Sequence, residues 1–256
     1  MSLIYSVLCH EHPDSVVDMI QNIFYYHKDI SCTIVLNTTP DMYTVLKAHE
    51  SPTIFLAPPS NKQMWTYDIL KGHIINFTFC QTNALRSTYF IPLASNCMFH
   101  RHVTLSEIND ACASVATSSS PAENYAKWHW PKFFRNYDII RCLRKHNIHK
   151  FDRGNHEGAI LPYDIMAKIV NFTLTNNIIS LIQQETVFEE MLLHTLYSHF
   201  VGREIVNICK IFTTSPNLTP SIEEIEAEKK PCVKRVDRNY NDPVRSWLRT
   251  QANNYV

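Results

Sequence analysis

The order of the first apolar segments constrains the fold more than any other feature of this sequence. Residues 3–10, LIYSVLCH, have strand character, 13–26 carry their apolar residues on one helical face, and 31–37, SCTIVLN, are strand-like again. Two parallel strands need a long crossover connection, which is usually a helix. A strand, a helix and a strand within 37 residues therefore predict a βαβ unit.

The same alternation continues along most of the chain. It predicts further strands at 53–57, 73–80, 87–95 and 204–212 and helices at 40–49, 139–146, 163–174 and around 186–196. Thr104 and Glu107 form a capping-box pattern that starts another helix, running to about Ala116. We therefore expect an α/β fold with a mainly parallel sheet flanked by helices, built as one domain over 1–256.

Glycine is scarce. The 256 residues contain four glycines, and none lies in a GxGxxG pattern or a P-loop. Those loops use glycine because its backbone can come close to phosphate. Any diphosphate that this chain holds must therefore be gripped by side chains. The formal net charge is zero, so composition gives no support to nucleic-acid or membrane-surface binding.

The eight cysteines are scattered and include no CxxC motif. We interpret them as reduced, mostly buried thiols. The chain opens without the pattern of a signal peptide, and no apolar stretch reaches the roughly 20 residues of a membrane span. These features predict a cytoplasmic protein without a membrane span, which fits a bacterial, protist or viral origin.

Two adjacent glutamates, Glu189 and Glu190, lie inside the apolar stretch 186–196, TVFEEMLLHTL. At about 100° per residue, Glu190 points away from the apolar face that includes Phe188, and the two carboxylates diverge. One carboxylate facing a cleft could serve as a general base. The alternative is a solvated helix side on which Glu190 pairs with His194, four residues on.

A basic segment lies near the end of the sequence. Seven cations fall within about 229–249: Lys229, Lys230, Lys234, Arg235, Arg238, Arg245 and Arg249. Lysine and arginine can clamp phosphate by charge and by forked hydrogen bonds. A solvated or acid-paired surface would give the same pattern, so both interpretations stay open.

Two short motifs contain histidine. His10 ends the first predicted strand, where ligands bind in open α/β sheets, so we expect it to contact substrate or nucleotide. A metal on His10 and His12 has no third ligand at a fixed spacing. The string GNHE at 154–157 is familiar from metallophosphoesterases, but the Asp-x-His and Gly-His-x-His motifs that complete their two-metal site are missing.

Five segments, in order, resemble the core-2/I-branching glycosyltransferase family, which includes β-1,6-N-acetylglucosaminyltransferases and peptide O-xylosyltransferases. They are 4–37, 89–108 (YFIPLASNCMFHRHVTLSEI), 157–170 (EGAILPYDIMAKIV), 187–196 (VFEEMLLHTL) and 233–242 (VKRVDRNYND). The chain departs from the family where Asn37 and Glu189 each replace an aspartate and Phe188 replaces a proline.

The resemblance implies a GT-A-like fold and an inverting, metal-independent transfer of N-acetylglucosamine or xylose from a UDP-sugar to a hydroxyl of a glycan or other acceptor. It implies no cofactor and no divalent metal, and the chain has no Asp-x-Asp motif. It places the catalytic base on Glu190. The other implied contacts are His10, Asn37, Lys234, Arg235 and Arg238 for the donor, and Asn96, Glu157 and Glu189 on the acceptor side.

Two other functions stay open. A catalytically inactive relative that binds UDP-sugar or acts as a scaffold is compatible with the departures at Asn37 and Glu189. A hydrolase of the metallophosphoesterase type would instead be built on the GNHE loop.

Overall fold

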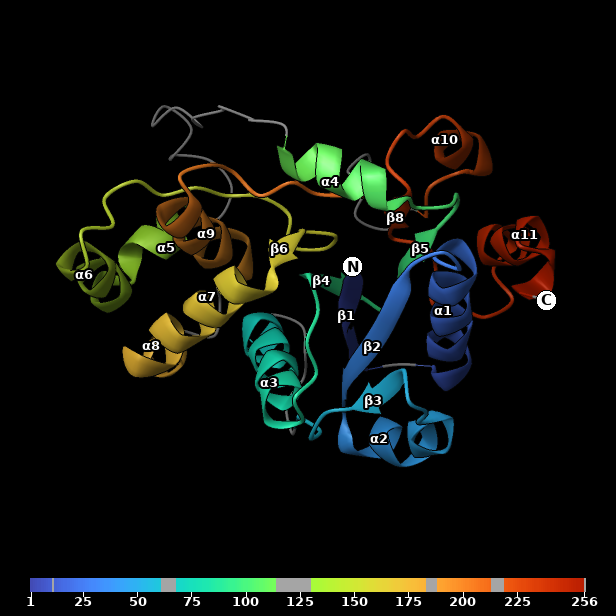
Figure 1. Ribbon diagram of the computed structural model, residues 1–256, viewed down its shortest axis with the longest axis horizontal. Coiled ribbons are helices and arrows are strands. Elements are labelled where there is room, and N and C mark those ends of the chain that lie inside the picture. The colour runs from blue at the N-terminus through green and yellow to red at the C-terminus, as the bar shows by residue number, and fades with distance from the viewer. Residues whose placement is uncertain (11, 61–67, 114–129, 183–187, 213–218, 256) are drawn as a thin grey trace.

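The computed structural model of the chain describes residues 1–10, 12–60, 68–113, 130–182, 188–212 and 219–255. Its centre is a five-stranded sheet in the order β3-β2-β1-β4-β6 (Figure 1). The strands are β1 (Ser2–Cys9), β2 (Ser31–Thr38), β3 (Ile54–Leu56), β4 (Tyr89–Ala94) and β6 (Leu161–Pro162). The first four are parallel and β6 is antiparallel to β4. The predicted α/β class, with a mainly parallel sheet flanked by helices, is confirmed.

Helices cover both faces of this sheet. On one face lie α1 (Pro13–Tyr26) and α11 (Pro243–Gln251), and on the other lie α3 (Asp68–Thr82), α7 (Tyr163–Thr175) and α9 (His194–Val201) (Figure 1). Strand β1 contributes alternate residues to two separate hydrophobic cores, since Tyr5 and Val7 belong to one and Ile4 to the other. Burial on both faces explains why β1 is apolar almost without interruption.

A second, smaller sheet has the strand order β5-β8-β7. Its strands are β5 (Cys97–Phe99), β8 (Cys232–Lys234) and β7 (Cys209–Ile211). The other helices are α2 (Pro40–Leu46), α4 (Leu105–Ala113), α5 (Trp130–Arg135), α6 (Tyr137–Lys145), α8 (Ile178–Leu181) and α10 (Ile222–Glu226). Single turns of 3₁₀-helix lie at Lys47–His49 and Asn253–Tyr255.

One predicted strand is wrong. Residues 73–80 belong to α3, which buries Leu70, Ile74 and Phe77 against the sheet. Six of the eight residues in 73–80 are apolar or β-branched, so the segment resembles a buried strand when taken alone. The strand predicted at 204–212 is shorter than expected, since β7 spans Cys209–Ile211 and Asn207 forms only an isolated bridge with Ala159.

The predicted start of α4 is confirmed. Thr104 Oγ1 accepts from the backbone N–H of Glu107 at 3.1 Å, and Glu107 Oε2 accepts from the backbone N–H of Thr104 at 2.9 Å. This is the reciprocal pair of a capping box. The helix is described to Ala113, and positions 114–116 of the prediction lie outside the described residues.

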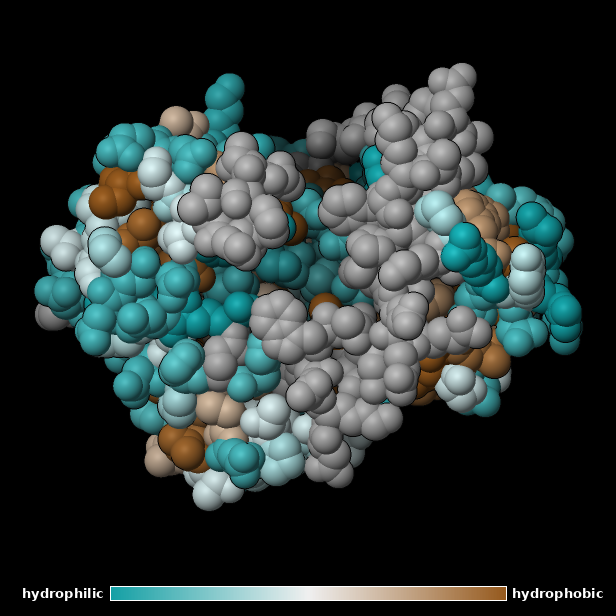
Figure 2. All heavy atoms as spheres, turned by 180° about the vertical axis from the view of Figure 1, so that it is seen from behind, coloured by the Kyte–Doolittle hydropathy of each residue, from teal (hydrophilic) through white to brown (hydrophobic). Residues whose placement is uncertain are grey.

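No helix in the described parts of the chain has the length and apolar character needed to span a membrane. On the face opposite to that of Figure 1, hydrophilic residues predominate and also line a central hollow, while hydrophobic residues form small separate patches (Figure 2).

Candidate functional site

The order in which the chain adds strands to the sheet reverses at β1. The chain passes from β1 through α1 to β2 on one side, and β4 later joins β1 on the other side. In open α/β sheets, ligands bind in the crevice beyond the carboxyl ends of the strands at such a switch point. Here His10 follows β1 and Ser95 follows β4, so these two residues mark the expected position.

Arg238 reaches this point from the segment after β8. Its Nε lies 3.4 Å from Ser95 Oγ, and burial together with the charge of Arg245 lowers its pKa to about 10, so it stays cationic at neutral pH. Burial and the charge of Arg238 lower the pKa of His10 to about 4, which keeps that imidazole neutral. Both line a cavity of about 80 Å³, with Leu8, Ile69, Leu93, Ala94, His156, Glu157 and Lys234.

A chain of ionisable groups forms one wall of the cavity. Lys234 Nζ donates to Glu157 Oε1, and His156 Nε2 lies 3.1 Å from the same oxygen. Burial opposes ionisation of Glu157, but His156 and Lys234 hold its pKa at about 2. Burial lowers the pKa of His156 to about 4. At neutral pH this wall therefore carries an ionised Glu157, a cationic Lys234 and a neutral His156.

A second carboxyl lies deeper behind the same histidine. Glu189 is 1% exposed, and neither of its carboxyl oxygens has a hydrogen-bond partner among the described residues. Its Oε1 is 4.0 Å from His156 Nδ1. Burial raises the pKa of Glu189 well above its ordinary value, which favours the neutral, protonated carboxyl. A buried neutral carboxyl can donate a hydrogen bond, but it is a poor base.

Glu190 occupies a different environment from its neighbour. Residues Glu189–Leu193 form a π-helical turn before α9, and Glu190 in this turn is half-buried. Its backbone carbonyl accepts from the N–H of Gly154 at 2.9 Å. Such turns are frequent at functional sites because they change the direction of side chains. The turn also means that the regular 100° spacing assumed from the sequence does not hold there.

The alternative of a solvated Glu190–His194 pair is contradicted for His194, which is buried. His194 is 6% exposed, and its Nε2 lies 3.2 Å from the backbone carbonyl of Asn155. A Cβ atom at Gly154 would come within 2.4 Å of the His194 ring, so only glycine allows this approach. The ring therefore packs into the protein beneath the GNHE loop.

The amides among the predicted site residues are buried. Asn37 donates to Pro58 O at 3.0 Å and accepts from Ser60 Oγ at 2.7 Å, so both ends of its amide bind the loop after β3. Asn96 follows Ser95, and its Oδ1 is buried without a hydrogen-bond partner in the described parts of the chain. The donor role of Asn37 and the acceptor role of Asn96 stay predictions.

The basic tail divides into parts with different partners. Arg245 is fully buried and donates to Asp18 at 2.7 Å, and Arg249 lies 3.4 Å from the same carboxylate. These two arginines attach α11 to α1. Lys234 pairs with Glu157, as described above. The tail is therefore not a single phosphate clamp.

Arg235, directly after β8, has a φ of 74°. This left-handed conformation is costly for a residue other than glycine and tends to persist at ligand-binding sites. The side chain is half-buried. Its predicted donor role stays a prediction.

His73 is a site residue that the sequence did not indicate. It lies on α3, its Nδ1 is 2.8 Å from Ser6 Oγ, and its ring lies 5.6 Å from that of His156. Burial lowers its pKa well below the ordinary value. A correct helix assignment for 73–80 would have placed His73 one turn after Ile69, which lines the cavity of about 80 Å³.

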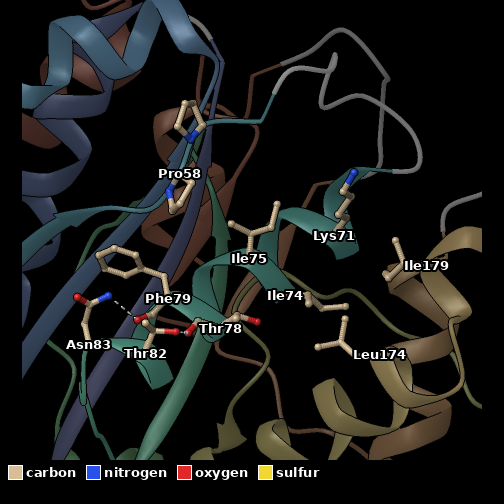
Figure 3. A pocket seen from close by; sticks show the side chains of 11 residues that line it. Pro58, Lys71, Ile74, Ile75, Thr78, Phe79, Thr82, Asn83, Leu174 and Ile179 are labelled. Atoms are coloured by element: carbon tan, nitrogen blue, oxygen red, sulfur yellow. Dashed lines mark hydrogen bonds between the residues drawn. The ribbon is translucent and has the colours of Figure 1, made fainter.

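A larger cavity lies elsewhere. It measures about 530 Å³ and lies between α3, the prolines after β3, the end of α7 and α8 (Figure 3). Ile74, Phe79 and Leu174 make its lining mainly apolar, and Lys71 is its one ionisable residue in the described parts of the chain. We place the candidate chemistry in the smaller cavity because the ionisable groups converge there.

Comparison with known proteins gives structural likenesses alone. No family model matches the chain, and no curated protein matches it in sequence. An active-site mutant of LgtC aligns at a TM-score of 0.43 with 8% identity, over 99% of this chain and 96% of that one. A galactosyltransferase LgtC complex with donor and acceptor sugar analogues aligns at 0.40 with 8% identity over the same shares.

The WbbM bifunctional glycosyltransferase aligns at a TM-score of 0.44 with 11% identity, over 99% of this chain and 50% of that one. Every one of these TM-scores is below 0.5, so no site or activity is transferred from these proteins.

Proposed function

We propose that this protein is a glycosyltransferase that uses a UDP-sugar without a divalent metal and inverts the configuration of the transferred sugar. One observation carries the proposal: the Arg238 guanidinium lies with His10 and Ser95 at the switch point of a sheet that has no glycine phosphate loop. Any diphosphate bound at this position would have to be held by side chains. The resemblance of five segments to the core-2/I-branching family supports the same class.

The charges at the switch point favour an anionic ligand. Burial and repulsion by the nearby Arg245 cation lower the pKa of Arg238. A diphosphate beside Arg238 would offset that repulsion and accept charge-assisted hydrogen bonds. During transfer, the same cation would stabilise the charge that develops on the leaving UDP. Arg235 is the second donor contact in this proposal.

The three carboxyl groups near the site have different roles in this proposal. Glu157 is ionised but engaged by Lys234 and His156, and burial raises the pKa of Glu189 well above its ordinary value. Glu190 is half-exposed, as a base that meets an acceptor must be. In this proposal Glu190 removes the proton from the acceptor hydroxyl as its oxygen attacks the anomeric carbon, which is general base catalysis. Glu189 supplies a neutral hydrogen-bond donor behind it.

Calorimetry with UDP in the presence of EDTA tests the donor site. Arg238→Ala should weaken UDP binding about 10- to 100-fold, because it removes a charge-assisted hydrogen bond worth about 1.5–3 kcal/mol. Lys229→Ala, an exposed cation of the same tail, is the matched control and should leave affinity unchanged. Loss of UDP binding in EDTA, or equal effects of the two substitutions, would contradict the proposal.

Binding without turnover would favour the inactive alternative. The amide of Asn37 replaces a family aspartate and is engaged by Pro58 and Ser60. A screen for UDP release across donor sugars, with EDTA present, separates an enzyme from a binding protein. UDP release with at least one donor and a hydroxyl acceptor would support the enzymatic function. Tight UDP binding without release from any donor would support the alternative of an inactive relative.

A further inference from the structure

Three thiols meet inside the small sheet. Cys97 on β5, Cys209 on β7 and Cys232 on β8 are each at most 1% exposed. Their Sγ atoms all lie within 4.8 Å of one another, and all three are free cysteines. No other group of three or more His, Cys, Asp or Glu side chains in the described parts of the chain lies close enough to share a metal ion.

Strand pairing explains why the three side chains converge. Cys209 pairs with Cys232 in the parallel β7–β8 ladder, and Cys97 pairs with Lys234 in the antiparallel β5–β8 ladder. Cys232 and Lys234 are two residues apart on β8, so they point to the same face. Directly paired residues share a face as well. The register of three short strands therefore places all three thiols on one side, next to Lys234.

We propose that Cys97, Cys209 and Cys232 bind a thiophilic divalent cation of the zinc class. Zinc binds cysteine thiolates at about 2.3 Å, which places sulfurs in a tetrahedral site about 3.8 Å apart. The thiols lie within about 1 Å of that spacing, so small rotamer changes close the site. Thiolates prefer Zn²⁺ to Mg²⁺ or Mn²⁺, so this site is chemically distinct from a metal that would hold a donor diphosphate.

The surroundings supply what three thiolates around a divalent cation need. Such a centre carries a net negative charge, and the Lys234 ammonium interacts electrostatically with Cys97 and Cys209. Glu157 Oε2 is buried without a hydrogen-bond partner among the described residues, and its carboxylate interacts electrostatically with Cys97 and Cys232. That oxygen is our candidate for the fourth ligand.

The loop that carries Glu157 packs against β7, the strand that carries Cys209. A Cβ atom at Gly158 would lie 2.4 Å from Cys209 Cβ, and Gly158 has a φ of 75°. Its carbonyl accepts from the N–H of Ile208 at 2.9 Å. The ion would therefore hold together three strands and the loop that positions Glu157. This role does not depend on the proposed sugar transfer.

Refolding with and without metal tests the site. The full chain is unfolded under reducing conditions with a chelator, refolded with Zn²⁺, with Cd²⁺ or without metal, and freed of excess ions. We expect native mass spectrometry to find one retained ion per chain and the melting temperature to rise with the fraction loaded. We expect Cd²⁺ to add thiolate-to-metal charge-transfer absorption.

Variants assign the ligands. Cys97→Ser, Cys209→Ser and Cys232→Ser should each lose the retained ion, whereas Cys80→Ser, a buried cysteine on α3, should keep it. If a ligand variant fails to fold, X-ray absorption at the zinc edge of the unmodified protein still decides, with three sulfurs expected at about 2.3 Å. No retained ion, fewer sulfurs, a disulfide within the cluster, or metal loss in Cys80→Ser would overturn the proposal.

Discussion

Glu189 and Glu190 show how far adjacent residues of the same type can differ. The sequence predicted that the two carboxylates diverge, and it left open whether Glu190 faces a cleft or lies on a solvated helix side. The structure buries Glu189 and leaves Glu190 half-exposed in a π-helical turn. It could not be predicted which of the two pKa values changes, because the raised pKa of Glu189 arises from burial by segments distant in the sequence.

Kinetics of two single variants test this division at the residue scale. Glu190→Gln keeps the shape of the side chain and removes its basicity, so turnover should fall about 10²- to 10⁴-fold while UDP affinity changes little. Glu189→Gln resembles the protonated form that burial of this carboxyl favours, so turnover should fall by much less. Near-normal turnover of Glu190→Gln in a transfer assay with a responsive donor and acceptor would show that Glu190 is not the base.

Elements were predicted best where their pattern was local. The βαβ opening and the capping box of α4 follow from a few neighbouring residues, and both are present. Helix α3 was missed because contact with the sheet on one side and with α7 on the other makes it apolar around most of its circumference. Without that helix, His73 could not be assigned to the site.

The attachment of α11 to α1 gives a prediction at the scale of elements. Arg245→Met should lower the free energy of unfolding by about 3–5 kcal/mol, because it leaves Asp18 charged and buried, with the partly exposed Arg249 as a weaker partner. The double variant Asp18→Leu with Arg245→Met should lose less, since no buried charge is left alone. Urea unfolding of the wild type and both variants measures this. A double variant less stable than Arg245→Met would contradict it.

At the scale of the whole molecule, the sequence predicted the position of the site better than the residues that form it. Parallel strands bring His10 and Ser95 to one edge of the sheet. Glu157 and Lys234, by contrast, come from loops and strands far apart in the chain, and no spacing in the sequence predicts their ion pair. The same applies to the three thiols, which show no CxxC motif and meet only through strand register.

Buried histidines make the whole molecule sensitive to acid. Four histidines are at most 6% exposed, and burial lowers the pKa of each: to about 4 for His27, His156 and His194, and well below the ordinary value for His73. The unfolded chain binds these protons below about pH 6.5, whereas the folded state does not. The contribution of these histidines to the free energy of unfolding is therefore fully present above pH 6.5 and is lost as the pH falls. Glu189, with its raised pKa, acts in the opposite direction with one proton.

Between about pH 6 and 5, the unfolded chain therefore binds up to about three more protons than the folded state: four on the histidines, less one on Glu189. Each proton is worth about 1.4 kcal/mol per pH unit, so the free energy of unfolding should fall by up to about 4 kcal/mol per pH unit. That loss is large against a total stability of about 5–15 kcal/mol, so we expect cooperative unfolding before pH 4. His27→Gln, outside the candidate site, should reduce the slope by about one proton, and His149→Gln, at an exposed histidine, should not change it. Urea unfolding followed by circular dichroism at several pH values measures the slope. If stability stays constant down to pH 5, or if both variants change the slope equally, the buried histidines do not control acid unfolding.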